Sequence, residues 1–287
     1  MAKVATILIP YSPEHKRLSF RAIESARNQS IPCDIIFDES PLTPAHVRNY
    51  PLNPYYAIKT PFVVWLDADD WLERDFVEQC LKTYKRGHYV YTGWYEGDFV
   101  RTPPACNPFA NASHHIVTTL YPTEVFKYLG GFDVNLPGYE DIDLYLRSAR
   151  AGLCGILCNS PLVHYTGDGQ RGKSFAENPD SERIRNAVVM RNGGERTMGG
   201  CCGAAGEPIA GNPGDKQEGD VLAQVLWSGM RTEVSWFNTA RVYRGGNHEE
   251  IWVDPRDVQA RPSLFRKVID LSALTPSEES LKEAGII

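Results

Sequence analysis

The chain has 287 residues, 42% hydrophobic and 23% charged, which predicts a globular, soluble protein of one large domain or a domain with an appendage. Its formal net charge of −6 argues weakly against tight nonspecific DNA binding, although a local basic groove is compatible with it. No apolar run reaches the ~18 residues of a membrane-spanning helix, and the N-terminus shows no signal-peptide cleavage pattern.

The N-terminal part of the chain is predicted to alternate strands with helical stretches. Residues 4–10 and 33–38 are apolar and β-prone, and an amphipathic helical pattern that ends at Pro32 lies between them. Residues 62–66 form a third, buried strand, bounded by Pro61. Strands separated by helical stretches predict an α/β fold with a doubly wound, mostly parallel sheet.

Three aspartates, Asp67, Asp69 and Asp70, follow the strand 62–66 directly. Open α/β sheets bind ligands at the carboxyl ends of their strands. Two acids in the pattern Asp-x-Asp on a tight turn can hold a hard divalent cation between themselves and a phosphate. The alternative interpretation is a strand followed by a helix that Asp69 or Asp70 caps.

The middle of the chain continues the alternation of helices and strands. The predicted elements are a helix over 73–86, a strand over 89–94, a loop over 97–115, a helix over 123–130, a helix from Glu140 to Gly152, a strand over 155–158, a polar loop over 166–174 and a helix over 175–192. Glu140 and Asp141 fall in the first turn of their helix, where the helix dipole favours anions.

The C-terminal third differs in character. Residues 193–214 are dense in glycine and indicate a linker or irregular loop. Short β-prone pieces at 221–227, 233–237, 241–244 and 250–253 then predict a small antiparallel barrel or sheet, followed by a terminal helix with Pro276 at its first position. We therefore predict a catalytic domain at 1–192, a linker at 193–215 and a small β module with a terminal helix at 216–287.

Six motifs occur in one order along residues 1–175. They are Ile7-Leu8-Ile9-Pro10-Tyr11, Ile35-Ile36-Phe37-Asp38-Glu39-Ser40, Arg48-Asn49, Leu66-Asp67-Ala68-Asp69-Asp70, Gly130-Gly131-Phe132-Asp133 with Glu140-Asp141, and Val163-His164-Tyr165. Together they resemble the family 2 glycosyltransferases of the GT-A fold and their DxD motif. The resemblance implies a Rossmann-like catalytic domain that uses a nucleotide-sugar donor.

The resemblance also implies the donor-side roles. Asp69 would bind Mn²⁺ or Mg²⁺, and His164 would be a second ligand, which favours Mn²⁺. The nucleotide-sugar contacts that the resemblance and the Gly-flanked loop 166–174 suggest are Pro10, Tyr11, Asp38, Arg48, Asp67, Arg171 and Lys173. The alternatives are a packed strand-end histidine for His164 and a solvated loop for Arg171 and Lys173.

On the acceptor side, the resemblance implies that Asp141 is the general base and that Glu140 orients the acceptor. One displacement with one base inverts the anomeric carbon. The alternative for this acidic pair is capping of the helix N-terminus. The family commonly has a glycine after its second strand, whereas this chain has Asp38-Glu39-Ser40-Pro41, which leaves the nucleotide open. Acceptor specificity is expected in the loop 97–115.

Two features bear on the setting of the protein. Residues 242–244 and 252–257 look like SH3-like β modules of bacteriophage proteins, which suggests a phage-encoded enzyme. Seven scattered cysteines without a CxxC pair favour a reducing cytoplasm. The sequence thus predicts an inverting, metal-dependent transfer from a UDP-sugar to a phage DNA base, a virion protein or a surface glycan. The alternative is a virion protein whose glycosyltransferase-like domain serves for binding or structure.

Overall fold

The computed structural model describes residues 2–11, 16–39, 44–56, 58–103, 115–150, 153–166, 179–191, 221–225, 250–253, 265–267 and 271–286. The chain forms two compact units. The first comprises Met1–Gly203 with Leu271–Ile287, and the second comprises Ala204–Asp270. The terminal segment therefore belongs to the first unit, so the prediction that grouped it with the module 216–287 is wrong for these residues.

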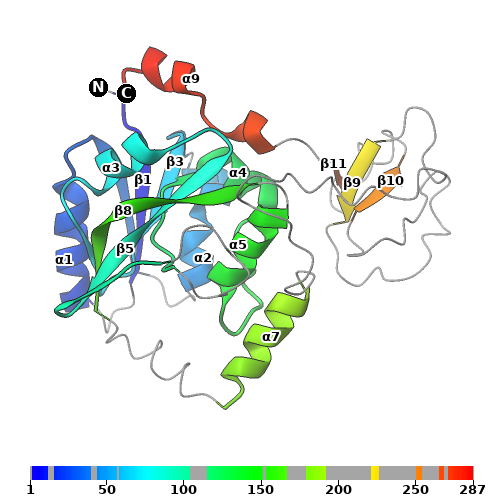
Figure 1. The fold of residues 1–287 in the computed structure, drawn as a ribbon, viewed down its shortest axis with the longest axis horizontal. Coiled ribbons are helices and arrows are strands. Elements are labelled where there is room, and N and C mark those ends of the chain that lie inside the picture. The colour runs from blue at the N-terminus through cyan, green and yellow to red at the C-terminus, as the bar shows by residue number, and fades with distance from the viewer. Residues whose placement is uncertain are drawn as a thin grey trace. The chain divides into compact units, whose positions relative to one another are not determined.

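The first sheet carries the strands that the N-terminal sequence predicted (Figure 1). Its strand order is β2-β1-β3-β7. Strand β1 (Ala5–Tyr11) pairs in parallel with β2 (Cys33–Glu39) and with β3 (Phe62–Trp65), and the short β7 (Tyr121–Pro122) is antiparallel to β3. Because β1, β2 and β3 are parallel, their carboxyl ends share one edge of the sheet.

The second sheet is mixed, with the order β4-β8-β5-β6. Strand β8 (Cys154–Tyr165) runs parallel to β5 (His88–Glu96), while β4 (Trp71–Leu72) and β6 (Phe99–Arg101) are antiparallel to their neighbours. The predicted loop 97–115 thus begins with a hairpin strand, and residues 104–114 lie outside the described residues.

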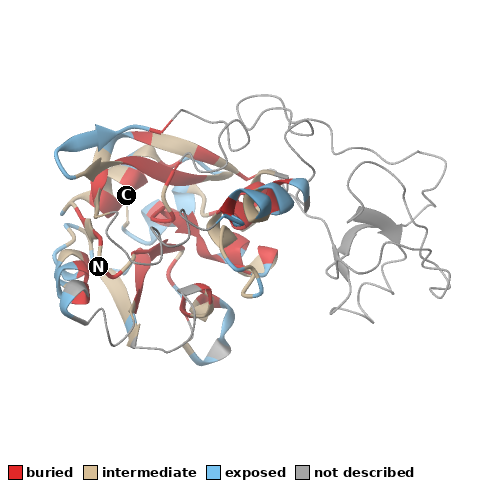
Figure 2. Ribbon diagram, turned by 90° about the horizontal axis from the view of Figure 1, so that it is seen from below, coloured by how far each residue is buried: buried red, intermediate tan, exposed pale blue. Residues whose placement is uncertain are grey.

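Helices and the aromatic core complete the first unit. The helices are α1 (Lys16–Arg27), α2 (Pro44–Arg48), η2 (Tyr50–Leu52), η3 (Pro54–Tyr56), α3 (Phe76–Thr83), α4 (Thr123–Leu129), α5 (Glu140–Arg150), α7 (Ser181–Arg191), η5 (Leu271–Leu274) and α9 (Glu278–Glu283). Strand β3 is buried at every position, and its Trp65 packs against Tyr121, Phe126 and Phe132. Figure 2 shows in red how buried residues are distributed over the described strands and helices. Helix α7 packs against α5 through Val188, Ile142 and neighbouring apolar residues.

The terminal segment is attached to the first unit by three hydrogen bonds. Tyr84 Oη donates to Pro276 O at 2.8 Å, Gly87 N donates to Thr275 Oγ1 at 2.9 Å and Arg86 Nε donates to Ser272 O at 3.0 Å. The predicted terminal helix is present, but it starts later than expected, because Ser277 is its N-cap and accepts a hydrogen bond from Ser280 N. The buried Leu281 anchors this helix.

The second unit contains a three-stranded antiparallel sheet of order β10-β9-β11. Its strands are β9 (Val221–Val225), β10 (Glu250–Val253) and β11 (Phe265–Lys267). The antiparallel pairing agrees with the prediction of a small β module, and its closure into an SH3-like barrel stays a prediction. The predicted strands at 233–237 and 241–244 and the linker 193–215 lie outside the described residues. None of the described helices combines the length and apolar character that crossing a bilayer requires.

Candidate active site

The three aspartates of the Asp-x-Asp segment lie on a tight turn at the carboxyl edge of the first sheet. Leu66 N donates to Leu8 O at 2.9 Å, which extends the β1–β3 pairing to the start of the turn, and Asp70 N donates to Asp67 O at 3.1 Å to close it. Asp67 and Asp69 are half-buried and Asp70 is buried. The turn therefore presents carboxylates where open α/β sheets bind ligands.

Asp70 is held inside the protein rather than at a helix end. Thr166 N donates to Asp70 Oδ1 at 2.9 Å, and burial, followed by the charge of Asp67, raises the pKa of Asp70 to about 8. The next helix, α3, starts at Phe76 with Asp75 as its N-cap residue. The interpretation that Asp69 or Asp70 caps this helix is therefore wrong.

Arg48, at the end of α2, connects the aspartate turn to helix α5. Its guanidinium binds Asp67 through Nη2 and donates from Nη1 to Glu140 Oε1 at 2.8 Å. Burial lowers the pKa of Arg48, but the charges of Asp67 and Glu140 outweigh this effect and raise it. Arg48 stays a cation and is engaged with the protein's own carboxylates, whereas the resemblance implies a direct contact to the nucleotide sugar.

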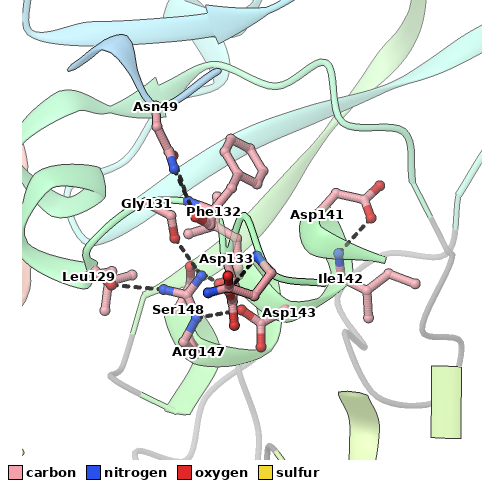
Figure 3. Close-up of polar contacts among 12 residues, drawn as sticks. Asn49, Leu129, Gly131, Phe132, Asp133, Asp141, Ile142, Asp143, Arg147 and Ser148 are labelled. Carbon is pink, nitrogen blue, oxygen red and sulfur yellow. Dashed lines mark hydrogen bonds and ion pairs between the residues drawn. The ribbon is translucent and has the colours of Figure 1, made fainter. Parts of the chain in front are cut away.

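Glu140 and Asp141 occupy the first turn of α5, as predicted. Asp141 Oδ1 accepts a hydrogen bond from Ile142 N at 2.8 Å (Figure 3). Burial and the neighbouring Glu140 raise the pKa of Asp141 to about 6, while Arg48 lowers it. The helix N-terminus was expected to favour the ionised form of Asp141, but burial is the largest effect on its pKa and raises it. A carboxyl with a pKa near 6 is ionised at neutral pH and can accept a proton.

The loop before α5 is fixed by contacts that the sequence did not predict. Asn49 Nδ2 donates to Phe132 O, and Phe132 N donates to Asn49 Oδ1, both at 2.8 Å (Figure 3). Gly131 has φ +72°, and a Cβ there would lie 2.4 Å from Asn49 Oδ1, so glycine is required. Arg147, paired with Asp143 at 2.7 Å, donates to the carbonyls of Leu129 and Gly131.

The backbone is also unusual where the loop meets α5. Tyr139, directly before Glu140, has φ 61°, and among the described residues it is the non-glycine with a positive φ. This conformation is disfavoured for a bulky L residue. The Tyr139 side chain is secured by its hydroxyl, which lies 2.7 Å from Ser181 Oγ on α7. Strain of this kind is concentrated at functional sites, and it lies next to both predicted acceptor-side acids.

The predicted nucleotide-side residues Pro10, Tyr11 and Asp38 are brought together by the β1–β2 register. Pro10 pairs with Asp38, and the Tyr11 ring lies 6.4 Å from that of Phe37. Burial, with the charge of Asp38, raises the pKa of Tyr56, which places that tyrosine close to the same strand end. Sequence reasoning missed Tyr56, whose signal was only an aromatic pair in a proline-containing segment.

His164 pairs with Trp71, the residue that directly follows the aspartate turn. Its Nε2 lies 2.6 Å from Glu73 Oε1, and its ring stacks between Trp71 and Tyr95 with centroids 4.6 Å away on each side. Burial, followed by the charges of Asp70, Asp67 and Asp69, raises the pKa of the adjacent Tyr165 to about 12. Neighbouring residues of a strand point to opposite faces. His164 therefore has the contacts of a packed strand-end histidine, the alternative that the sequence left open.

The carboxylates fit a divalent cation that receives most of its ligands from a substrate. No group of three or more His, Cys, Asp or Glu side chains in the described ranges is placed to hold a metal ion by itself. Asp67 is bound to Arg48, and Asp69 is half-buried on the same turn. Mg²⁺ and similar ions are commonly held by one or two carboxylates together with substrate phosphates. Arg171 and Lys173 lie outside the described residues.

The first unit is thus a mixed α/β fold with carboxylates at the strand ends and an acidic start to helix α5. A mannosyltransferase from Pyrobaculum calidifontis, solved with GDP-Man and Mn²⁺, matches over 67% of this chain and 65% of its own, with 15% identity and a TM-score of 0.51. TarS 1–349 from S. aureus, solved with UDP-GlcNAc, matches over 66% of this chain and 67% of its own, with 12% identity and a TM-score of 0.49. A second structure of TarS 1–349 matches over 66% of each chain, with 12% identity and a TM-score of 0.46.

The chain thus matches just under two thirds of the length of the mannosyltransferase and of this second TarS 1–349 structure. At 15% identity, the likeness to the mannosyltransferase concerns the fold. No family model matches the sequence, and no curated protein matches it.

Proposed function

We propose that this protein is an inverting, metal-dependent glycosyltransferase that moves a sugar from a nucleoside-diphosphate sugar to a hydroxyl group of a macromolecular acceptor. The observation that carries the proposal is the pairing, through Arg48, of the aspartate turn with the acidic start of α5. One side of this pairing suits a nucleotide sugar, and the other suits an acceptor. The GT-A-like fold, shared with a mannosyltransferase, supports the assignment.

On the donor side, Asp69 is the proposed metal ligand and Asp67 the proposed contact to the ribose or metal. Pro10, Tyr11 and Asp38 lie at the neighbouring strand ends, where a nucleoside would rest. A bound divalent cation would neutralise the negative charge that develops on the departing pyrophosphate. The mannosyltransferase with GDP-Man and Mn²⁺ supports this chemistry. His164 stays a proposed second ligand, and it would bind the ion only by giving up its hydrogen bond to Glu73. Arg171 and Lys173 stay proposed contacts to the pyrophosphate.

On the acceptor side, Asp141 is the proposed general base and Glu140 the group that orients the acceptor. Asp141 takes the proton from the acceptor hydroxyl as that oxygen attacks the anomeric carbon opposite the leaving nucleotide. A single displacement of this kind inverts the anomeric configuration. Burial supports the role, because a carboxyl with a pKa of about 6 holds a proton more strongly than an exposed aspartate does.

The finer assignments are proposals that the fold alone does not distinguish. We propose a UDP-sugar as donor and, from the short C-terminal β pieces, a phage-encoded enzyme acting in the host cytoplasm on DNA, a virion protein or a surface glycan. The three-stranded sheet of the second unit is the proposed docking module.

A nucleotide-release assay tests the proposal. The full chain is incubated with UDP-sugars and with GDP-mannose, each with Mn²⁺ and with EDTA. Release of nucleotide that depends on Mn²⁺ is expected, and NMR of the product should show the inverted anomer. Intact-mass analysis of DNA and virion proteins from cells that express the chain then identifies the acceptor. If no donor is bound and no nucleotide is released, the transferase proposal fails and the alternative of a virion protein is favoured.

A further inference from the structure

One buried cation lies between two carboxylates that belong to different halves of the proposed site. Arg48 binds Asp67, which follows β3, and also Glu140, which starts α5. The Arg48 side chain is 7% exposed, so water competes little for either contact. Asp67 is on the proposed donor side and Glu140 on the proposed acceptor side.

We propose that Arg48 is a positioning residue that couples the donor side of the site to the acceptor side, so that a change at Glu140 alters nucleotide affinity at Asp67. This proposal rests on the proposed function only in calling the Asp67 side the donor side and the Glu140 side the acceptor side. The bridge itself is a property of the fold. Coupling between two sites is reciprocal, so acceptor binding would also respond to the nucleotide.

The surroundings of Arg48 favour a guanidinium that binds Asp67 and Glu140 at the same time. Trp65 Nε1 donates to Arg48 O at 3.1 Å, and the next residue, Asn49, is bound to Phe132, so the chain is fixed at Arg48 and at the residue that follows it. Arg48 Nε is buried and finds no hydrogen-bond partner among the described residues, which leaves the two terminal nitrogens to make the contacts. A change in the charge of one carboxylate therefore alters the interaction of Arg48 with the other carboxylate.

The direction of the effect follows from charge. In the intact protein, one positive charge is divided between Asp67 and Glu140. If Glu140 is made neutral, Arg48 acts on Asp67 alone and reduces the negative field that the turn offers to a cation bound at Asp69. A lysine does not reproduce this bridge, because its charge is concentrated on one ammonium nitrogen. The planar guanidinium of arginine instead offers separate nitrogens to the two carboxylates.

Isothermal titration calorimetry of UDP in Mn²⁺ tests the coupling, with GDP used if the wild type does not bind UDP. In Glu140→Gln we expect nucleotide affinity to fall by about 5-fold or more, the lower end of typical coupling between sites. In the Arg48→Lys background, the same Gln substitution should change affinity by less than about 2-fold, because the bridge is already lost. Glu124→Gln removes an exposed carboxylate paired with Lys127 on α4 and should leave affinity unchanged.

A second measurement does not require nucleotide. The melting temperatures of Asp67→Asn, Glu140→Gln and the double variant should be non-additive, because both side chains share Arg48. Unchanged nucleotide affinity in Glu140→Gln, with wild-type binding intact, would overturn the coupling while leaving the proposed function standing. If the wild type binds neither UDP nor GDP, the proposed function fails. Additive changes in melting temperature would overturn the bridge through Arg48.

Discussion

The side-chain amide of Asn49 binds both the N–H and the C=O of Phe132, a residue 83 positions later in the chain, at 2.8 Å each. This pair of hydrogen bonds fixes the segment that leads into α5 to the end of the short helix that carries Arg48. The position of Glu140 and Asp141 relative to the aspartate turn therefore depends on Asn49, although Asn49 has no proposed chemical role.

Replacing Asn49 by alanine should destabilise the first unit. The substitution leaves the N–H and C=O of Phe132 without their partner, which costs ~1–3 kcal/mol for each buried polar group left unsatisfied. We expect the melting temperature to fall by at least ~2–4 °C, measured by calorimetry. Asn53→Ala is the control, because Asn53 is exposed and its side chain accepts only a local hydrogen bond from Tyr55 N. Equal melting temperatures for the two variants would contradict the anchoring role.

Asp141→Asn should retain nucleotide binding and lose transfer. The amide keeps the shape of the side chain but cannot accept the proton, and loss of a general base typically lowers the rate ~10²–10⁴-fold. In the wild type, the transfer rate should decrease as the pH falls through about 6, where burial places the pKa of Asp141. The Asn variant should lack this decrease. Near-normal transfer by the variant, or a product that keeps the donor's anomeric configuration, would exclude Asp141 as the base.

Asp69→Ala should abolish the dependence of nucleotide binding on Mn²⁺. Asp69 is the proposed direct carboxylate ligand of the ion, so its removal leaves the ion held mainly by the phosphate oxygens of the nucleotide. Calorimetry with UDP, in Mn²⁺ and in EDTA, measures the effect. The melting temperature should change little, because Asp69 lies on the turn outside the apolar core. Equal UDP affinity of the wild type in Mn²⁺ and EDTA would remove the metal from the proposal.

Asp70→Asn should stabilise the metal-free protein at alkaline pH. Burial raises the pKa of Asp70 from 3.8 to about 8, so the folded state holds the proton more tightly than the unfolded chain does. The resulting stability is fully present below about pH 4 and is lost as the pH rises through about 8. In EDTA, the variant should therefore melt above the wild type at pH 9, and the difference should shrink toward pH 5. Asp98→Asn, on an exposed hairpin turn, should show no such trend.

Limited proteolysis should cut first in the glycine-dense residues 193–214, because ordering such a chain costs much conformational entropy. The C-terminal fragment should nevertheless co-purify with the N-terminal one, since residues from Leu271 to Ile286 are hydrogen-bonded and packed on the first unit. Mass spectrometry of the gel-filtration peak identifies both fragments. Separation of the fragments under native conditions would contradict this placement of the terminal segment.

Local patterns in the sequence determined the strands and the acids that follow them. Residues 62–66 are uniformly apolar and end at Asp67, and this run alone predicts a buried strand with polar groups at its carboxyl end. The parallel pairing of β1, β2 and β3 followed from the helical stretches between them. The helix start at Glu140 was likewise visible as apolar periodicity.

Only the tertiary structure decided which of these groups meet. Arg48 and Glu140 are 92 residues apart, and their ion pair depends on the packing of α2, β3 and α5, which no local pattern encodes. The same holds for His164, whose strand position was predictable but whose side-chain face was set by the register of β8 against β4 and β5. The pKa of Asp141 depends on burial by distant segments, so the sequence could place this carboxylate on its helix but could not predict its proton affinity.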